Sequence, residues 1–415
     1  ATVRAQPLLS RRLGTVGLMA SAAPSRRLRV GVLGTASIAD KICWAAEQTS
    51  TCAIVAVASR SHERARRWAD ERGIEFAFGS YGELLSSGAV DAVYIALPCA
   101  LHAEWGCLAA GKGLHVLCEK PLAASAAEAR ALVEGCKRSG VLLMDGQMWP
   151  HHPRTGDMLG ALSGLGGVRR ATCCLSFKAP HEFWTSNIRA DAALEPLGCL
   201  GDLGWYCAAA LDAFLAPGGE LPARVFCHID WSGDRARQLD SPARGGEELT
   251  GAAAKCRGVP ISAHAMLIYA SGATGSFHCG FDAARRDFFE AHCSEGVLRC
   301  DDWVHPQELD TFGTSLVQLR ASPPPQLPAH FRVRRAGQVA WEERQAEACW
   351  QEVRMIERFV SVALSARGEP DTAVDASLPQ AAEAEVLRWG DAACRVQRIL
   401  EACLASENHG AFDLT

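Results

Sequence analysis

Apolar and polar positions follow a regular rhythm from Leu28 to about residue 144. Short apolar runs, which predict buried strands, alternate with segments whose apolar positions recur at helical spacing. The predicted strands cover residues 29–33, 53–58, 75–78, 91–97, 113–117 and 141–144. Strands that alternate with helices in this way predict an α/β fold with a doubly wound parallel sheet.

The rhythm changes from about residue 145 onward. Strand-like runs predict a second, antiparallel and meander-like sheet at residues 169–177, 224–230, 264–269, 274–279 and 296–300. Gly-, Pro- or Arg-rich stretches at 233–258 and 320–338 predict exposed loops, and residues 343–364 and 380–402 are expected to be helical. The expected division is an extension at 1–27, a first domain at 28–147, a second domain at 148–405 and a tail at 406–415.

Composition and charge exclude several classes of protein. The chain has 415 residues, enough for two domains, and its net charge of −5 argues against nucleic acid as a main partner. No apolar run approaches the ~18 residues that would span a membrane. The 18 cysteines include no C-x-x-C pair and no zinc-ligand spacing with histidine. We therefore expect a reducing compartment such as the cytoplasm, no disulfide framework and no metal site.

The first 27 residues are rich in arginine, and the first acidic residue of the chain is Asp40. Segments of this kind resemble transit peptides, which would direct the protein to a chloroplast or mitochondrion. The alternative is a natural start at Met19, which opens a plausible N-terminus. Both interpretations stay open, and this disordered or targeting extension is left out of the fold prediction.

A nucleotide-binding pattern follows the first predicted strand. The residues Gly34-Thr35-Ala36-Ser37-Ile38-Ala39 lead into a helix that ends near Glu47. Dinucleotide-binding folds carry G-x-G-x-x-G/A here, because small residues let the backbone approach a pyrophosphate at the helix N-terminus. Alanine in place of the second glycine weakens the match, but the strand–turn–helix context favours a dinucleotide cofactor.

The end of the second predicted strand indicates which cofactor is used. An acidic residue that would bond the adenosine 2′-hydroxyl normally stands there. This chain has Ser59-Arg60 instead, which removes the repulsion of a 2′-phosphate and supplies a cation to bind it. The sequence therefore favours NADP(H), with NAD(H) as the alternative cofactor and a solvated Arg60 as the alternative interpretation.

A lysine ends the fifth predicted strand, in Leu117-Cys118-Glu119-Lys120-Pro121. Ligands of open α/β sheets bind at the carboxyl ends of the strands. Pro121 fixes its own φ and ends strand pairing, so Lys120 is held on a rigid corner. A surface lysine in a strand-to-helix turn is the alternative.

A second set of polar residues precedes an alanine-rich helix, where Asp202 and Tyr206 are four residues apart. Residues with this spacing lie on one face of a helix, so a carboxylate and a phenol could both reach a cleft. The alternative is an acidic residue that interacts with the helix dipole and a half-buried tyrosine.

Together, these residues resemble the glucose-fructose oxidoreductase / inositol dehydrogenase / rhizopine-catabolism family of NAD(P)-dependent oxidoreductases. The resemblance extends from about Leu28 to at least Leu364. The tyrosine at position 206 resembles the residue found in the dihydrodiol dehydrogenase and NADP-xylose dehydrogenase branch. Several short sequence segments resemble those of plant and algal members. The motifs that carry it are the fingerprint at Gly34, Leu97-Pro98 with His102, Glu119-Lys120-Pro121, Met148-Trp149, Asn187-Ile188-Arg189 and Gly201-Asp202-x-Gly204-Trp205-Tyr206.

The resemblance implies an N-terminal Rossmann domain and a C-terminal α+β domain with a large, mostly antiparallel open sheet. In the family this sheet often forms a subunit interface, so we expect a homodimer or homotetramer. The resemblance makes Lys120, Asp202 and Tyr206 the catalytic residues. It implies cofactor contacts from Gly34, Thr35, Ala36, Ser37, Ile38, Ser59, Arg60, Leu97, Pro98, His102, Glu119 and Lys120.

This sequence departs from many members of the family at Asp145, where they carry glutamate, and at Pro150, where they carry arginine. The longer loop at 233–258 is a further departure. These differences concern the substrate pocket and not the fold. Candidates for the pocket wall are Trp149, Arg189 and Trp205, with core packing as the alternative for each.

We therefore expect an NADP-dependent oxidoreductase that moves a hydride between the nicotinamide and a carbinol or carbonyl carbon of a sugar, polyol or related small compound. Tyr206 is expected to exchange the hydroxyl proton, with Lys120 favouring its phenolate; Lys120 as the acid/base is the alternative. Asp202 would orient the lysine or hold a substrate hydroxyl. A non-catalytic NADP-binding sensor and an NAD-dependent elimination enzyme of the glycosidase type are the other functions left open.

Overall fold

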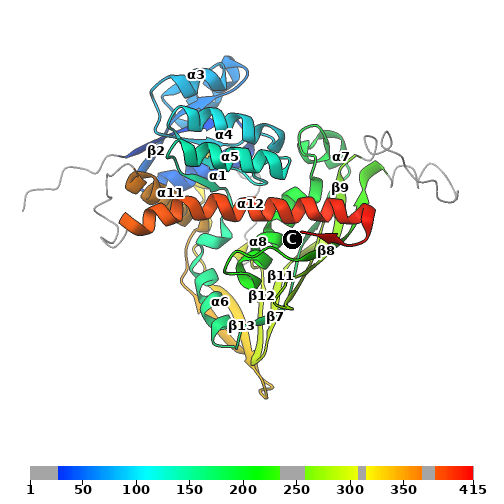
Figure 1. The fold of residues 1–415 in the computed structure, drawn as a ribbon. Helices are drawn as coiled ribbons and strands as arrows, with labels where there is room; N and C mark the ends of the chain where they lie inside the picture. Colours follow the sequence, from blue (N-terminus) through cyan, green and yellow to red (C-terminus); the bar gives the residue numbers. More distant parts are fainter. Residues whose placement is uncertain (1–26, 234–257, 307–314, 367–378, 415) are drawn as a thin grey trace, which may run out of the picture.

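The structure is a computed structural model that describes residues 27–233, 258–306, 315–366 and 379–414. The expected extension before residue 27 and nearly all of the expected loop at 233–258 lie outside the described residues. Two sheets organise the rest (Figure 1). One is six-stranded and lies beneath the N-terminal helices, and the other is nine-stranded and forms the tapering lower half of the molecule.

The first sheet is entirely parallel, with the strand order β3-β2-β1-β4-β5-β6. The order reverses between β1 and β4, and a crevice for ligands opens at such a switch point. The strands are β1 (Leu28–Leu33), β2 (Cys52–Ala58), β3 (Phe76–Phe78), β4 (Ala92–Ile95), β5 (His115–Cys118) and β6 (Leu143–Asp145). The helices that connect them are α1 (Ser37–Glu47), α2 (His62–Arg72), α3 (Tyr81–Ser86), α4 (His102–Gly111) and α5 (Ala126–Arg138). The predicted doubly wound sheet is confirmed.

The second sheet has the order β14-β13-β12-β11-β7-β10-β9-β8-β15. Only β7 and β10 pair in parallel among its described strands; the other neighbours are antiparallel. Its long strands are β7 (Val168–Lys178), β8 (Arg224–Trp231), β9 (Pro260–Ile268), β10 (Thr274–Gly280) and β11 (Asp282–Cys293). The others are β12 (Gly296–Asp301), β13 (Ala329–Arg335), β14 (Glu342–Ala346) and β15 (Phe412–Asp413).

Several sequence predictions for this half were wrong in detail. The strand β11 was not predicted, β13 lies in an expected loop, and β14 lies where a helix was expected to begin. In β13 the buried side chains of Ala329, Phe331 and Val333 alternate with polar ones, so the period of two is present but is obscured by arginine. The expected tail instead completes α12 (Pro379–His409) and forms β15, which pairs with β8.

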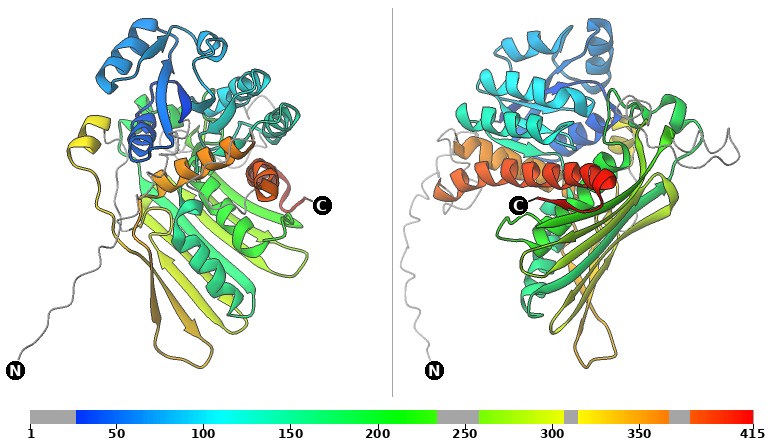
Figure 2. Two further views of the ribbon diagram at one scale, coloured as in Figure 1. Left: turned by 90° about the vertical axis from the view of Figure 1, so that its left-hand side faces the viewer. Right: turned by 45° about the vertical axis from the view of Figure 1, so that its right-hand side comes forward.

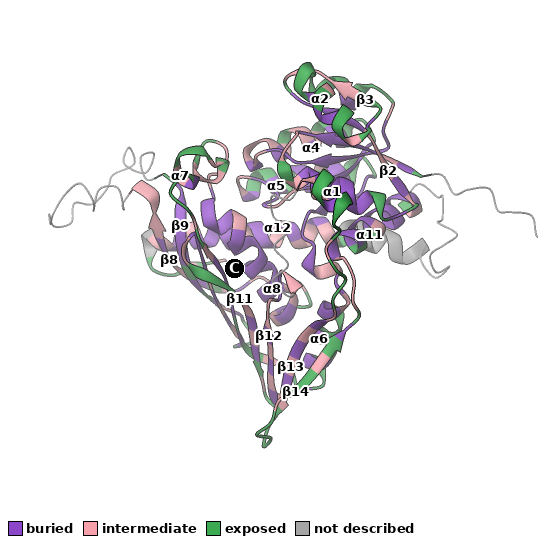
Figure 3. Ribbon diagram, turned by 180° about the vertical axis from the view of Figure 1, so that it is seen from behind, coloured by how far each residue is buried: buried purple, intermediate pink, exposed green. Residues whose placement is uncertain are grey.

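Helices cover one face of the nine-stranded sheet in the described part of the chain (Figure 2). The helix α8 (Trp205–Leu215) packs on β7 and β10, and α12 packs on β8. Most residues of α8 are buried, and α12 carries buried apolar residues such as Val396, Ile399 and Leu400 (Figure 3). We call the opposite side the outer face; its central row crosses the strands at His228, His264, His278 and Cys174.

The two C-terminal helices also return to the first sheet. The helix α11 (Gln351–Ala366) packs against α1, and α12 packs against α5 and β6 as well as α8. Buried side chains of α11, among them Met355 and Phe359, share a hydrophobic cluster with α1 and β1. The expected second domain is therefore not spatially separate from the first, because its last helices complete the core of both.

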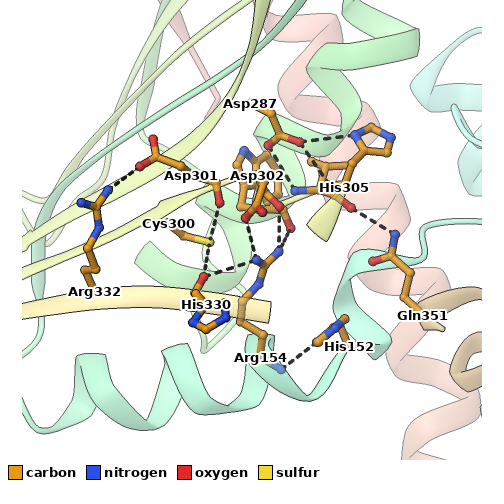
Figure 4. Close-up of polar contacts among 12 residues, drawn as sticks. His152, Arg154, Asp287, Cys300, Asp301, Asp302, His305, His330, Arg332 and Gln351 are labelled. Carbon is orange, nitrogen blue, oxygen red and sulfur yellow. Dashed lines mark hydrogen bonds and ion pairs between the residues drawn. The ribbon is translucent and has the colours of Figure 1, made fainter. Parts of the chain in front are cut away.

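A buried arginine shapes the turn that follows β12 (Figure 4). Arg154, at the start of α6 (Pro153–Ser163), is only 2% exposed. Its guanidinium donates to the Asp302 carboxylate at 2.8 Å and to the carbonyl oxygens of Asp302 and Trp303 at 2.8 and 2.9 Å. Asp302 has a φ of 62°, so this non-glycine residue is held in a left-handed conformation by the contact. The turn leads directly to His305.

Replacing Arg154 by Met should reduce the free energy of unfolding by about 3–5 kcal/mol, because it leaves buried acceptors without their donor. Urea unfolding measures this change. Arg138→Met is the matched control, since the Arg138 side chain is exposed and 3.9 Å from Glu134; it should change stability by less than about 0.5 kcal/mol. Equal effects of the two substitutions would show that the Arg154 contacts do not stabilise the fold.

Candidate active site

A cavity of about 750 Å³ lies between the two sheets, at the carboxyl ends of β1, β2, β4 and β5. Its opposite wall is formed by β7, β11 and the segment between α7 (Phe183–Ser186) and α8. It therefore coincides with the crevice predicted by the strand order. Both motif-bearing halves of the chain contribute to it.

The fingerprint forms one end of this cavity. Gly34 has a φ of 99°, and a Cβ atom there would lie 2.7 Å from the Ala96 carbonyl oxygen, so a side chain is excluded on two grounds. The helix α1 begins directly afterwards, with Ala36 at its N-cap and no side chain capping its first amides. Open backbone N–H groups at a helix N-terminus bind phosphate, so these residues fit a dinucleotide.

All the expected cofactor residues except His102 line the cavity. The structure adds Arg64, in the first turn of α2. Arg60 precedes the extended N-cap Ser61, so helical spacing does not relate the two arginines and gave no signal for Arg64. The residues that line the cavity as expected are Gly34, Thr35, Ala36, Ser37, Ile38, Ser59, Arg60, Leu97, Pro98, Glu119 and Lys120.

His102 has a different place, because its ring is buried behind the cavity wall and does not line it. Its Nδ1 lies 2.8 Å from the Pro121 carbonyl oxygen and its Nε2 lies 2.7 Å from the Leu97 carbonyl oxygen. The ring therefore ties the end of β4 to the corner that carries Lys120. The sequence led us to expect a direct contact between His102 and the cofactor. In the structure His102 instead positions the corner that carries Lys120.

Lys120 and Asp202 form the centre of the cavity. The Lys120 Nζ donates to the Asp202 Oδ1 at 2.7 Å and to the Asp202 carbonyl oxygen at 2.9 Å. The Arg189 Nε lies 2.9 Å from the other carboxylate oxygen, Oδ2. Burial opposes ionisation of Asp202, but Arg189 and Lys120 outweigh it and hold the pKa of this carboxyl well below its usual range. The Asp202 carboxylate thus faces two cations, and the carboxyl groups of Glu119 and Glu195 also lie close enough to interact with Arg189.

A π-helical turn at Leu200–Gly204 places Asp202 and leads without interruption into α8. Such turns are rare and are frequent at functional sites. Asp202 and Tyr206 both line the cavity, so the predicted convergence of the pair is observed. It arises through a widened turn and not through the regular helix that the sequence predicted.

The Tyr206 phenol lies beside this cluster, with the Lys120 Nζ 5.0 Å from the centre of its ring. Burial, followed by the charges of Glu119 and Asp202, raises the pKa of Tyr206 well above its usual value. The expectation that Lys120 favours the phenolate is therefore not met in this structure. A phenol that keeps its proton is suited to donate it.

Two further carboxyl groups, those of Glu119 and Asp145, lie at the carboxyl ends of β5 and β6. The Tyr94 hydroxyl donates to Glu119 at 2.6 Å, and burial raises the pKa of this carboxyl. Asp145 accepts from the Trp205 indole at 3.1 Å and from the Gln147 amide at 2.6 Å, and burial likewise raises its pKa. Asp145 thereby connects the end of β6 to the first residue of α8.

The expected pocket residues divide into two groups. Arg189 lines the cavity, whereas Trp149 and Trp205 are 3% and 0% exposed and belong to the core. The Trp149 indole donates to Gln147 at 2.9 Å, and its ring packs against Trp303. For both tryptophans the alternative interpretation, core packing, is the observed one.

The sequence prediction missed much of the wall opposite the fingerprint. These residues come from β7, the α7 segment, the unpredicted strand β11 and the turn after β12, and only Asn187 stands in a motif, Asn187-Ile188-Arg189. They are Leu175, Ser176, Phe177, Phe183, Ser186, Asn187, Glu195, Arg285, Arg286, Asp287 and His305.

Within the described residues, no group of three or more His, Cys, Asp or Glu side chains is arranged to hold a metal ion. Over the same part of the chain, no helix combines the length and apolar composition needed to cross a bilayer.

Residues 28–147 match the model of an oxidoreductase family with an NAD-binding Rossmann fold, and residues 163–299 match the GFO/IDH/MocA C-terminal domain. The chain is 36% identical over 274 residues to D-xylose 1-dehydrogenase (NADP(+)) 2 of Haloferax volcanii, covering 65% of this chain and 75% of that protein. It is 32% identical to a dTDP-3,4-didehydro-2,6-dideoxy-alpha-D-glucose 3-reductase of Actinomadura kijaniata, over 68% and 76% of the two chains.

Among solved structures, the chain resembles KijD10, a 3-ketoreductase from Actinomadura kijaniata in complex with NADP and TDP-benzene. The TM-score is 0.71 at 25% identity, over 92% of this chain and 98% of that one. The likeness to plant and algal members stays a prediction. The family models and the two relatives, each covered over more than two thirds of its length, show that the chain belongs to the GFO/IDH/MocA family of oxidoreductases.

Proposed function

We propose that the protein is an NADP(H)-dependent oxidoreductase of sugars, polyols or related small hydroxy or dicarbonyl compounds. It would move a hydride between the nicotinamide and a carbinol or carbonyl carbon. The observation that carries this proposal is the Lys120–Asp202 pair, which joins the two walls of a cavity that also contains a dinucleotide fingerprint. The relatives support the substrate class, since one is named for D-xylose and another for a dTDP-keto sugar.

The choice of NADP(H) is supported by the charges at the fingerprint end. Arg60 and Arg64 both line the cavity there, and Ser59 stands where a carboxylate would select NAD(H). Guanidinium groups bind phosphate with paired hydrogen bonds. The D-xylose dehydrogenase relative is named for NADP(+), and KijD10 was solved with NADP.

The chain's own residues would handle the proton and the charge of the reaction. The cofactor supplies or accepts the hydride when bound. In reduction, Tyr206 donates its proton to the carbonyl oxygen, and the neighbouring cations Lys120 and Arg189 stabilise the negative charge that develops there. In oxidation the same groups act in reverse. Lys120 is the alternative proton donor, but two of its three N–H bonds already go to Asp202.

Two alternatives are distinguished by simple measurements. A non-catalytic NADP-binding sensor would bind cofactor and turn over no substrate; the presence of lysine, aspartate and tyrosine together favours catalysis. An NAD-dependent elimination enzyme would retain its cofactor through gel filtration and give no net NADPH. Net production of NADPH from a free sugar would exclude both.

We propose the division of labour expected from the sequence, with residues 28–147 holding the cofactor and residues 148–405 supplying the substrate wall and the subunit contact. The outer face of the nine-stranded sheet is the surface proposed for a homodimer or homotetramer. It carries Met266, which is 43% exposed, and the paired rings of His264 and His278. Their ring centres are 4.2 Å apart.

We also propose a reducing compartment, because the described cysteines are free thiols, several of them in the core. The cytoplasm is the proposed location. A chloroplast or mitochondrion is the alternative if residues 1–27 act as a transit peptide.

Cofactor titration by tryptophan fluorescence should give a dissociation constant for NADPH at least about tenfold below that for NADH. Arg60→Ala should weaken NADPH binding about tenfold while leaving NADH binding within about threefold, because the proposed partner of the arginine is the 2′-phosphate, which NADH lacks. Arg67→Ala is the control, since Arg67 lies exposed on α2, seven residues after Arg60, and outside the cavity. The assignment would be contradicted if the wild-type protein bound NADPH and NADH equally well. It would also be contradicted if Arg60→Ala weakened the binding of both cofactors by the same factor.

Tyr206→Phe should lower the rate of carbonyl reduction by about 10²–10⁴-fold without changing NADPH affinity. Because burial raises the pKa of Tyr206, the phenol keeps its proton at higher pH. The wild-type rate of reduction should therefore show no fall between pH 7 and about 10 that is caused by ionisation of Tyr206. Tyr81→Phe, at the fingerprint end of the same cavity, is the control and should reduce at nearly the wild-type rate. A Tyr206→Phe enzyme of full activity would remove Tyr206 as the donor.

A further inference from the structure

The turn that follows β12 is held in place from three sides (Figure 4). Arg154 of α6 binds its first residues, and Gln351 of α11 donates to the Val304 carbonyl oxygen at 3.1 Å. The Asp287 carboxylate of β11 accepts from the backbone amides of Val304 and His305 at 3.2 and 3.1 Å. Side chains from three separate elements thus restrain one short turn.

The side chain that this turn presents is the imidazole of His305. Its Nδ1 lies 3.3 Å from the Asp287 Oδ2, so the carboxylate that holds the turn also orients the ring. A carboxylate beside Nδ1 favours the tautomer with the proton on that nitrogen and leaves Nε2 for another partner. Among the described residues no group bonds this Nε2, and the side chain is 30% exposed, so the nitrogen is open to a ligand.

The pair lies on the side of the second sheet that faces the active site. Asp287 pairs with Leu175 and is two residues before Phe289, and both of these apolar side chains are buried in the core beneath the helices. Alternate residues of a strand share a face, so Asp287 points to this side as well. Asp287 and His305 both line the cavity that contains Lys120, and the proton transfer proposed for Tyr206 uses neither of them.

His305 is also a neighbour of the helix that follows the fingerprint. It lines a second, small pocket together with Lys41 of α1 and Glu352 of α11. The Lys41 Nζ lies 2.6 Å from the Glu352 Oε1. Burial opposes ionisation of Glu352, but Lys41 lowers the pKa of this carboxyl and the charge of His305 acts in the same direction. The imidazole therefore lies close to the Lys41–Glu352 ion pair.

This position brings His305 close to the expected pyrophosphate. Lys41 is four residues after Ser37, the first residue of α1, so it lies on the same helix face about 6 Å along the axis. Ser37, Lys41 and His305 all line the cavity. A dinucleotide bound by the open amides of this helix would place its pyrophosphate beside Ser37. Lys41 is already paired with Glu352, whereas the His305 Nε2 is not paired.

We infer that His305, oriented by Asp287, binds the central part of NADP(H) through its Nε2, at the pyrophosphate or at the ribose that carries the nicotinamide. This inference rests on the proposed function and gives the second sheet a direct role in holding the cofactor. Both groups present oxygen atoms: a protonated imidazole donates to a phosphate, and a neutral one accepts from a ribose hydroxyl. The alternative is that Nε2 faces only the small pocket beside Glu352.

Calorimetric titration with fragments of the cofactor tests the inference without a substrate. The probes are 2′-phospho-ADP-ribose, which lacks the nicotinamide, adenosine 2′-phosphate 5′-diphosphate, which also lacks the second ribose, and 2′,5′-ADP, which lacks the pyrophosphate. His305→Ala should weaken 2′-phospho-ADP-ribose about tenfold and leave 2′,5′-ADP within about twofold. A similar loss with the diphosphate probe identifies the pyrophosphate as the partner, and a loss confined to the ribose-bearing probe identifies the ribose.

His305→Gln keeps a hydrogen-bonding group and should recover part of the lost affinity. His292→Ala is the matched control, because His292 is exposed on the outer face of the second sheet, 3.0 Å from Glu290 and outside the cavity. It should leave the affinity for every probe unchanged.

The inference is overturned if His305→Ala binds 2′-phospho-ADP-ribose as tightly as the wild-type protein. It is also overturned if His305→Ala weakens 2′,5′-ADP by the same factor, since the loss would then come from a disturbed fingerprint. A wild-type protein that binds no NADPH would instead overturn the proposed function, and this inference with it.

Discussion

The carboxylate of Asp202 is the point at which the two halves of the molecule meet chemically. It accepts from Lys120, at the end of a strand of the first sheet, and pairs with Arg189, in the segment that leads into α8. Both side chains of the Lys120–Asp202 pair are nearly buried, at 11% and 12% exposure. Removing Asp202 would leave two cations without their shared anion in a desolvated site, so this carboxylate holds the positions of Lys120 and Arg189.

The surrounding fold provides rigid supports for this pair. On the first sheet, the buried ring of His102 ties the end of β4 to the corner beside Lys120. On the second, the Trp205 indole bonds Asp145 at the end of β6 and so fixes the start of α8, directly after the π-helical turn that carries Asp202. The return of α11 and α12 to the first sheet joins the two cores behind these contacts. Catalytic geometry of this kind requires such supporting contacts.

The residues that the sequence could identify are those set by local backbone requirements. The fingerprint at Gly34 and the strand-end position of Lys120 follow from strand–turn–helix chemistry, so the parallel sheet and the cofactor end of the site were predictable. The cavity residues of β11 were not, because the alternation of this strand is interrupted by charged residues and the strand itself was not predicted. Trp149 and Trp205 show the opposite error, since an aromatic residue beside a motif packs in a core as readily as in a pocket.

The central claim is that Lys120 and Asp202 act as one unit in catalysis and not as independent contributors. The most direct test is a double-mutant cycle on kcat/KM with Lys120→Met, Asp202→Asn and the combined variant, with NADPH affinity measured in each. Our account predicts that the combined variant is no more than about threefold slower than the slower single variant, with cofactor binding retained. Losses that multiply in the combined variant would contradict it, and would show that the two groups contribute separately.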